Sequence, residues 1–268
     1  MKTALTIAGS DSGGGAGIQA DLKTFAAHGV FGTCAITALT AQNTVAVEGV
    51  HAIPPGFVAL QIDAVVKDIG ADVVKTGMLS NRGIIEAVAG KIVEHGLRLV
   101  VVDPVMVAKS GDALLELDAR DTLISLLLPL AAVITPNLPE AEVLCGFSIA
   151  DMEGMRRAAQ AILSRGPRCV VVKGGHLAGS DLSTDLFYDG ERFEELPAER
   201  LATRNTHGTG CTFASAIAAR LALGDGMLDA VRAAKRYVSA IIAVSAELDI
   251  GHGHGPMNHL GLLLPQRR

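Results

Sequence analysis

Apolar residues occur along this chain in two alternating kinds of segment. Short runs rich in β-branched residues are typical of buried strands, and they lie at residues 4–8, 34–39, 72–75, 99–102, 131–135 and 169–173. Longer segments have apolar residues three and four positions apart, as amphipathic helices do, and they lie at residues 18–27, 57–69, 84–94, 114–128 and 155–163. Strands that alternate with helices form right-handed crossovers. The pattern therefore predicts an α/β protein, a three-layer α/β/α sandwich with a mainly parallel central sheet.

The last third of the chain departs from this alternation. Residues 185–188 and 192–196 flank Asp189-Gly190, which predicts a hairpin with a tight turn. Two further helices are expected at residues 212–223 and 228–247. Because no linker, charge block or repeat interrupts the chain, we expect one domain over residues 1–268.

Composition and charge narrow the class of protein. The chain has 268 residues, of which 49% are hydrophobic and 3% aromatic, and this suits a compact α/β fold built from aliphatic layers. Its net charge of -5, with scattered basic residues, gives no basic patch for nucleic acid. The first ten residues hold too few apolar positions for a signal peptide or membrane span. We therefore expect a cytoplasmic protein with no nucleic-acid or membrane partner.

The cysteines predict no metal or redox site. Cys34, Cys145, Cys169 and Cys211 lie far apart and form no C-x-x-C motif. In a reducing compartment we expect four thiols.

In open parallel sheets, ligands bind beyond the carboxyl ends of the strands, so the residues that follow each strand are the candidates. The first strand leads into a glycine-rich stretch, residues 9–21. Gly15 to Ala20 formally match a dinucleotide-binding motif, but no acidic residue follows about 20 positions later, so a nicotinamide or flavin site is disfavoured. Asp21 could bind a small polar ligand or be a solvated helix carboxylate, and the residues alone leave both open.

Three later strands also end in polar residues. Asp103, in D-P-V-M, is placed to bind a hydrated divalent cation, although Asp-Pro is also an ordinary turn. Asn137 and Glu140 have the spacing of a capping box, and the same spacing could hold magnesium through water. Spacing alone favours the cap. Lys173 precedes two glycines and either binds phosphate or caps a solvated strand end.

The stretch N-T-H-G-T-G-C-T, from Asn205, is the best candidate anion site. The backbone N–H groups of Gly208, Thr209, Gly210 and Cys211 can converge on one anion at the positive end of the helix that follows. A thiol there is expected to ionise more readily than usual and to accept a proton from an attacking hydroxyl. The alternative is a thiol packed in the core. No P-loop motif occurs in the chain, so other residues, such as those of this stretch, must form any phosphate-binding site.

The histidine-containing run near the end of the chain is a weaker candidate. His252, His254 and His259 lie in a glycine-rich segment without helix or strand periodicity, so metal binding is disfavoured.

Taken in order, the motifs identify a family. The stretch from Thr6 to Lys23, T-A-Q-N-T, K-T-G-M-L, D-P-V-M, T-P-N-x-x-E, K-G-G-H and T-H-G-T-G-C-T resemble those of the hydroxymethylpyrimidine/phosphomethylpyrimidine kinases of thiamine biosynthesis, in the ribokinase-like superfamily. The resemblance covers nearly the whole chain, from residue 4 to about residue 259. It implies ATP-dependent phosphorylation of 4-amino-5-hydroxymethyl-2-methylpyrimidine and then of its monophosphate, with both steps in one site.

The resemblance also implies roles for individual residues. Pyrimidine contacts are expected from Gly9, Asp21, Gln42, Met78 and Val105, of which Asp21 and Gln42 would hydrogen-bond the ring. Asn137 and Glu140 resemble the family's magnesium and phosphate element, with the metal bound through water. Asp103, Lys173 and Thr206 would lie near the nucleotide phosphates. The turn from Gly208 to Cys211 would be the catalytic anion hole, with Cys211 as the base for the alcohol step.

The same comparison leaves two alternatives. Sugar kinases of the superfamily have G-A-G-D where this chain has Gly208-Thr209-Gly210-Cys211, and cysteine here is also found in some pyridoxal kinases. Pyridoxal or pyridoxine phosphorylation is therefore the nearest competitor, although Gln42 and Met78 favour the pyrimidine. A non-catalytic nucleotide or metabolite sensor is the second alternative. Relatives are commonly dimers, so a homodimer is expected, with the apolar segment 31–50 as a partner surface. The polar loop at residues 108–113 is suited to close over the site.

Overall fold

The computed structural model describes residues 1–106, 114–116, 118–175 and 182–263. The described strands form one nine-stranded sheet in the order β3-β2-β1-β4-β5-β6-β7-β8-β9. Their bounds are β1 Thr3–Asp11, β2 Phe31–Gln42, β3 Val47–Ala52, β4 Val73–Thr76, β5 Val100–Val102, β6 Val133–Ile134, β7 Val170–Val172, β8 Asp185–Tyr188 and β9 Phe193–Leu196. The six strands from β2 through β1, β4, β5 and β6 to β7 pair in parallel. Antiparallel pairing at β2–β3, β7–β8 and β8–β9 extends the sheet at both edges.

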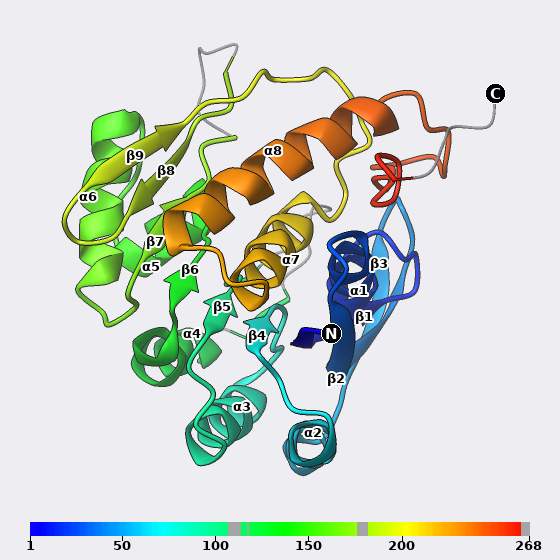
Figure 1. Ribbon diagram of the computed structural model, residues 1–268, viewed down its shortest axis with the longest axis vertical. Coiled ribbons are helices and arrows are strands. Elements are labelled where there is room, and N and C mark those ends of the chain that lie inside the picture. The colour runs from blue at the N-terminus through cyan, green and yellow to red at the C-terminus, as the bar shows by residue number, and fades with distance from the viewer. Residues whose placement is uncertain (107–113, 117, 176–181, 264–268) are drawn as a thin grey trace.

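Helices cover both faces of this sheet (Figure 1). Helices α1 (Gly17–Ala27), α7 (Thr209–Ala222) and α8 (Met227–Ser245) lie on one face. The other face carries α2 (Pro55–Asp68), α3 (Arg82–Glu94), α4 (Ala119–Thr122), α5 (Leu138–Cys145) and α6 (Met152–Leu163). The expected three-layer α/β/α sandwich is confirmed, and one continuous sheet joins the described strands.

Each face of the sheet has its own apolar core. Alternate residues of the central strands point to opposite faces, so Val100 and Val102 join the core beneath α3 whereas Val101 joins the core beneath α7. All three side chains are fully buried. Strands buried on both faces are continuous apolar runs, and this is why V-V-V segments mark the middle of the sheet.

The structure differs from the expected elements in three places. Helix α5 was not among the expected helices, although the spacing of Asn137 and Glu140 indicated a cap at its start. Strand β3 was not predicted, because its sequence V-E-G-V-H-A lies at the sheet edge with almost every position exposed. The helix expected from residue 114 begins only at Ala119 and continues through η1 (Leu123–Leu127) and η2 (Leu128–Leu130). The backbone N–H groups of Leu114 and Glu116 donate instead to the carbonyls of Met106 and Ser80, which holds this segment outside the helix.

The other expected helices and the hairpin are confirmed to within a few residues, with Gly190 in the left-handed conformation (φ +95°) at the hairpin turn. Of the helices that the structure describes, none is both long and apolar enough to cross a membrane.

Candidate active site

A cavity of about 760 Å³ opens at the carboxyl ends of the parallel strands, next to the N-terminus of α7. All but one of the candidate residues line it: Gly9, Gln42, Met78, Asp103, Val105, Asn137, Glu140, Lys173, Thr206, Gly208, Thr209, Gly210 and Cys211. Those before Thr206 lie at or just beyond the carboxyl ends of different strands, which the parallel topology brings to one edge of the sheet, and the rest lead into α7. Asp21 is the exception.

The turn before α7 has the backbone of an anion hole. Gly208 is the N-cap of the helix and adopts the left-handed conformation (φ +80°). A Cβ atom at this position would collide with the carbonyl oxygen of Gly15, so only glycine fits. The hydroxyl of Thr209 donates to the carbonyl of Thr206 over 2.7 Å and closes the turn. The first N–H groups of a helix lack intrahelical acceptors; that of Thr209 donates to the Thr206 carbonyl over 3.3 Å, and Gly208, Gly210 and Cys211 line the cavity beside it, so this helix N-terminus is suited to an anion.

Asp103 and Lys173 form an ion pair beside this turn. The Nζ atom of Lys173 lies 3.1 Å from Oδ1 of Asp103, and Thr135 donates to the same oxygen over 3.3 Å. The other carboxylate oxygen, Oδ2, is buried without a hydrogen-bond partner among the described residues. Gly210 is adjacent, because a Cβ there would be 3.2 Å from the Lys173 ammonium. The pair thus places a positive charge and an open acceptor next to the anion hole.

Asn137 and Glu140 form the capping box of α5, as their spacing indicated. The Asn137 side chain accepts from the Glu140 N–H over 2.9 Å, and Glu140 accepts from the Asn137 N–H over 2.8 Å. Burial raises the pKa of Glu140 to about 7, which Lys173 opposes and Asp103 reinforces. The same two side chains therefore cap α5 and line the cavity.

The expectation of an acidic Cys211 thiol is wrong for this structure. Cys211 lies in the first turn of α7 and is partly exposed to the cavity. Burial nevertheless raises its pKa to about 12; Lys75 opposes this increase, and the carboxylates of Asp103 and Asp21 add to it. Loss of solvent and the nearby carboxylates outweigh the effect of Lys75, so the thiol is protonated near neutral pH.

Asp21 does not reach the cavity, which corrects its expected contact with the pyrimidine ring. Its side chain is fully buried, and both carboxylate oxygens lie 3.0 Å from Nζ of Lys75. Thr6 and Ser215 donate to the two oxygens, each over 2.6 Å. All strong acceptor positions of the carboxylate are therefore used inside the protein.

The C-terminal histidines lie in different surroundings. His252 is exposed, whereas His254 lines the cavity. His259 is 3% exposed, with Nε2 2.9 Å from the hydroxyl of Thr212. All four cysteines are free thiols. The loop at residues 108–113, which was expected to close over the site, lies outside the described residues.

Comparison with known proteins identifies the chain. Residues 11–258 match the family described as phosphomethylpyrimidine kinase. The chain belongs to this family. The hydroxymethylpyrimidine/phosphomethylpyrimidine kinase of Rhizobium meliloti is 55% identical over 257 residues, which cover 96% of each chain. The bifunctional thiamine biosynthesis protein ThiED of Geobacter sulfurreducens is 54% identical over 256 residues, and these span 96% of this chain but only 52% of that longer protein.

Solved structures agree on the fold of this phosphomethylpyrimidine kinase family member. The pyridoxal kinase of Bacillus subtilis, solved as an ADP complex, superposes with a TM-score of 0.88 at 40% identity and covers 98% of both chains. The phosphomethylpyrimidine kinase of Clostridium difficile has a TM-score of 0.81 at 43% identity, over 90% of this chain and 100% of that one.

In this member of the phosphomethylpyrimidine kinase family, sequence reasoning missed a polar cluster on the cavity wall. The imidazole Nε2 of His207 lies 2.9 Å from Oδ2 of Asp11 and 3.3 Å from the amide nitrogen of Gln42. His207 was visible within T-H-G-T-G-C, but its partners are distant in sequence, and no local pattern joins them.

A group of apolar side chains from α7 and α8 on the cavity wall, which we call the apolar compartment, was also missed. Phe213 of α7 and Val238 and Ile242 of α8 line it, and it is suited to a flat ring such as a nucleobase. Lys235 forms an ion pair with Asp185 over 2.8 Å at its border. Only the apolar spacing of the two helices signalled it, and that spacing also fits an ordinary core.

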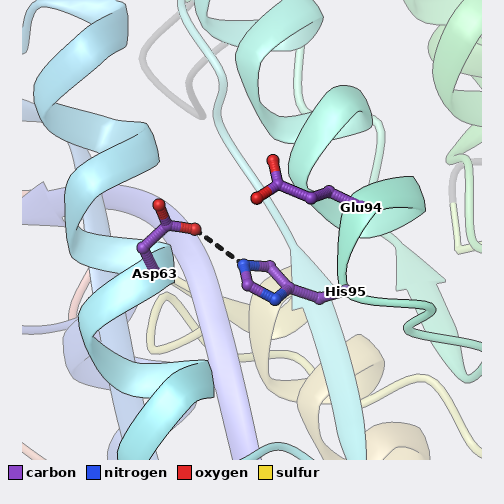
Figure 2. Close-up of side chains that lie close together, drawn as sticks. All are labelled: Asp63, Glu94 and His95. Atoms are coloured by element: carbon purple, nitrogen blue, oxygen red, sulfur yellow. Dashed lines mark hydrogen bonds and ion pairs between the residues drawn. The ribbon is translucent and has the colours of Figure 1, made fainter.

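A cluster of ligand-type side chains lies away from this cavity, between α2 and α3. Figure 2 shows His95 directed at Asp63, with Nε2 2.6 Å from Oδ1, and Glu94 alongside. The ammonium of Lys91 lies 2.9 Å from Asp63 and 2.8 Å from Glu94, and Lys67 adds a further contact with Asp63 at 3.2 Å. These cations already neutralise the carboxylates. The cluster is therefore an ion-pair network that joins the two helices.

Proposed function

We propose that the protein transfers the γ-phosphoryl group of ATP to the hydroxymethyl group of 4-amino-5-hydroxymethyl-2-methylpyrimidine, and then phosphorylates the monophosphate to the diphosphate. The observation that carries this proposal is the shared cavity: Gln42, Met78 and Val105 line the same space as the turn from Gly208 to Cys211. A ring bound at the first set would direct its substituent at the second. Identities of 50–55% with kinases named for this substrate support the assignment.

The geometry suits in-line phosphoryl transfer. The nucleobase of ATP fits the apolar compartment between α7 and α8, and its phosphates then extend toward Lys173 and the anion hole. The backbone N–H groups of that turn and the Lys173 ammonium stabilise the charge that the transferred group carries in the transition state. One cavity can serve both reactions, because the monophosphate extends from the same ring toward the same turn.

The residues at this site also fit a magnesium ion. Asp103 offers Oδ2, which has no hydrogen-bond partner in the described part of the chain, and Glu140 is a second carboxylate on the same wall, so oxygen donors of the kind that Mg²⁺ prefers are available. The capping box already uses one oxygen of each of its side chains, which favours contact through water, as the sequence suggested. When bound with ATP, Mg²⁺ would neutralise phosphate charge. Lys173 holds Asp103 in place from the opposite side.

Cys211 acts in this proposal as a neutral thiol that contacts the substrate beside the reacting oxygen. Because its pKa is raised, the thiol itself is not a ready base at neutral pH. A loose phosphoryl-transfer transition state needs little help from a base, because the attacking alcohol can keep its proton until the new O–P bond is well advanced.

The test is an ADP-release assay with the aminopyrimidine, its monophosphate, pyridoxal, pyridoxine and ribose compared under the same conditions. We expect turnover of the first two with the highest kcat/KM. A clear preference for pyridoxal would overturn the pyrimidine assignment, and ATP binding without turnover of any alcohol would indicate a sensor. The solved pyridoxal kinases are 36–40% identical to this chain, below the identity of the pyrimidine kinases.

We also propose that two copies associate through the β2–β3 edge of the sheet. Phe31, Leu39, Val45 and Val50 are 45–62% exposed there, and β3 is the last strand on that side. An exposed edge with apolar side chains favours pairing with another chain. Light scattering after size-exclusion chromatography should give twice the mass of one chain, and Val50→Lys should shift the protein to the monomer.

A further inference from the structure

His207 lies where four segments of the cavity wall meet. Its side chain contacts Asp11 at the end of β1 and Gln42 at the end of β2. Its backbone N–H donates to the carbonyl of Gly255 over 3.1 Å. A Cβ atom on Gly15 would collide with its ring. The imidazole is 12% exposed, and it has no role in the proposed phosphoryl transfer.

Asp11 is an anion in this arrangement because donors surround it. Oδ1 accepts from the N–H of Gly13 over 2.8 Å, and Oδ2 accepts from the N–H groups of Gly15 and Ala16 over 3.0 and 2.8 Å. A protonated carboxyl would present its own hydrogen to one of these donors. Burial raises the pKa of Asp11, but the hydrogen bonds from His207, Ala16 and Gly13 outweigh burial and lower it overall.

This anion determines where the proton of His207 lies. The nitrogen Nε2 is 2.9 Å from Oδ2 of Asp11, and an imidazole lone pair directed at a carboxylate would be repelled. Nε2 therefore carries hydrogen and donates it to Asp11. It then has no lone pair with which to accept a hydrogen bond from Gln42.

The amide of Gln42 meets a conflict as a result. Its nitrogen lies 3.3 Å from Nε2 of His207, so two donors face each other. On its other side, the amide oxygen lies 3.1 Å from the hydroxyl of Thr40, which is also 2.9 Å from the carbonyl of Ser10. Both oxygens are carbonyls and can only accept, and Thr40 has a single hydroxyl hydrogen, so one of these two contacts places two acceptors against each other. Rotating the amide by 180° removes both conflicts, because its nitrogen then donates to the Thr40 hydroxyl and its oxygen faces the Nε2–H of His207, whose single hydrogen it shares with Asp11.

We propose that His207, held by Asp11, is the positioning residue that fixes the Gln42 amide with its oxygen toward His207 and its nitrogen toward Thr40, and that this fixed amide selects amino- over oxo-pyrimidines. The amide then has one N–H and one oxygen lone pair left for a ligand, in a fixed order along the cavity wall. This inference rests on the proposed function only for its substrate. The arrangement of protons is a property of the protein alone.

The selectivity follows from the edge that the ring presents. An aminopyrimidine offers an amino donor beside a ring-nitrogen acceptor, whereas the 4-oxo analogue offers an oxygen acceptor beside a ring N–H donor. The two edges have opposite order, and the ring cannot turn over because its hydroxymethyl group must point to the anion hole. Binding of the oxo analogue would require the Gln42 amide to turn back, with its nitrogen toward His207. That orientation again places a donor against the N–H of His207.

The first experiment reads the proton directly in the ligand-free protein. Nitrogen NMR of histidine-labelled protein distinguishes protonated from unprotonated ring nitrogens, and the signals of His207 are assigned as those missing from His207→Leu. We expect hydrogen on Nε2. An unprotonated Nε2 would overturn the inference, whatever the protein phosphorylates.

The second experiment measures selectivity. The ratio of kcat/KM for the aminopyrimidine to that for the 4-oxo analogue should fall at least about tenfold in His207→Leu, which is about 1.4 kcal/mol, with the KM for ATP within about twofold. His252→Leu, the same change at an exposed histidine nearby, should leave the ratio unchanged. In the Gln42→Leu background, His207→Leu should have no further effect on the ratio, because the amide through which it acts is gone.

Other outcomes separate the possible failures. Equal loss of activity toward both analogues in His207→Leu, with an unchanged ratio, would indicate a merely structural role and overturn the inference. Independent effects of the two substitutions would also overturn it. If the wild-type protein did not phosphorylate the aminopyrimidine, the proposed function would fail, and the NMR result would still decide the arrangement of protons.

Discussion

The ammonium group of Lys75 lies 3.0 Å from both carboxylate oxygens of Asp21, and neither side chain is exposed to solvent. Lys75 belongs to β4 and Asp21 to α1, so the pair joins the sheet to the helix layer beneath the anion hole. Burial lowers the pKa of Lys75, but the negative charge of Asp21 outweighs burial and raises this pKa overall. The lysine therefore stays charged.

Removal of one partner of this pair should strongly destabilise the fold. Lys75→Met leaves the Asp21 carboxylate buried without its counter-ion, and we expect the free energy of unfolding to fall by about 3–5 kcal/mol in urea titrations. The double variant Lys75→Met/Asp21→Leu should recover most of this loss. Lys2→Met removes an ion pair whose lysine is 53% exposed and serves as the control with little effect. Equal effects of the two lysine substitutions would contradict the prediction.

A methyl group at Gly208 should abolish catalysis out of proportion to its effect on stability. Gly208→Ala forces a Cβ against the Gly15 carbonyl and displaces the turn, so kcat should fall by about 10²–10³, the usual cost of losing an oxyanion donor. Gly224→Ala is a matched control, since Gly224 also has positive φ (+101°) but open space around it. Both variants carry the backbone cost, about 1–2 kcal/mol, but only Gly208→Ala should lose activity. Similar kcat values in the two variants would exclude the anion hole.

The positions of the parallel strands were predictable because strands buried on both faces are continuous apolar runs. Strand β3 was not, since at an exposed edge neither face of a strand must be apolar. The convergence of Asp103, Asn137 and Lys173 also followed from the sequence, because each follows a parallel strand and topology alone brings such residues to one edge. These predictions needed no knowledge of side-chain partners.

Contacts between distant residues were beyond the reach of sequence patterns. Asp21 has the sequence position of a ligand-binding carboxylate. Its side chain instead forms a buried ion pair with Lys75, which lies 54 residues away in the sequence. The partner of Asp11, His207, is 196 residues away. The acidity of Cys211 was misjudged for the same reason, because burial and the carboxylates around it depend on the packed structure.

Replacement of Cys211 should affect both phosphorylations to a similar degree. A thiol base would matter for the alcohol but not for the monophosphate, whose nucleophilic oxygen is already ionised. With the pKa of the thiol raised to about 12, we expect Cys211→Ser and Cys211→Ala to lower kcat for the two steps by factors that agree within about threefold. Single-turnover rates measured separately for each substrate provide the test. A loss at least about 30-fold greater in the alcohol step would restore the role of Cys211 as the base.

Acid should weaken the fold through His259. Burial lowers the pKa of this imidazole to about 4, and the positive charge of Lys23 adds to the effect; in the unfolded chain the value is about 6.5. Between these two values the unfolded state binds more protons than the folded state. The contribution of His259 to the free energy of unfolding is therefore fully present above about pH 6.5 and is lost as the pH drops toward 4. The shift corresponds to about 3 kcal/mol over that window.

His259→Gln has no proton to take up and should flatten this part of the pH profile of the urea midpoint, although His28, whose pKa burial also lowers, will leave a residual slope. The variant is expected to be less stable than wild type at pH 7, where it loses the packed imidazole beside Thr212, and closer to wild type at pH 5. His252→Gln, at an exposed position, should follow the wild-type profile throughout. If His259→Gln instead ran parallel to wild type from pH 7 to pH 4, the buried imidazole would not be the group that senses acid.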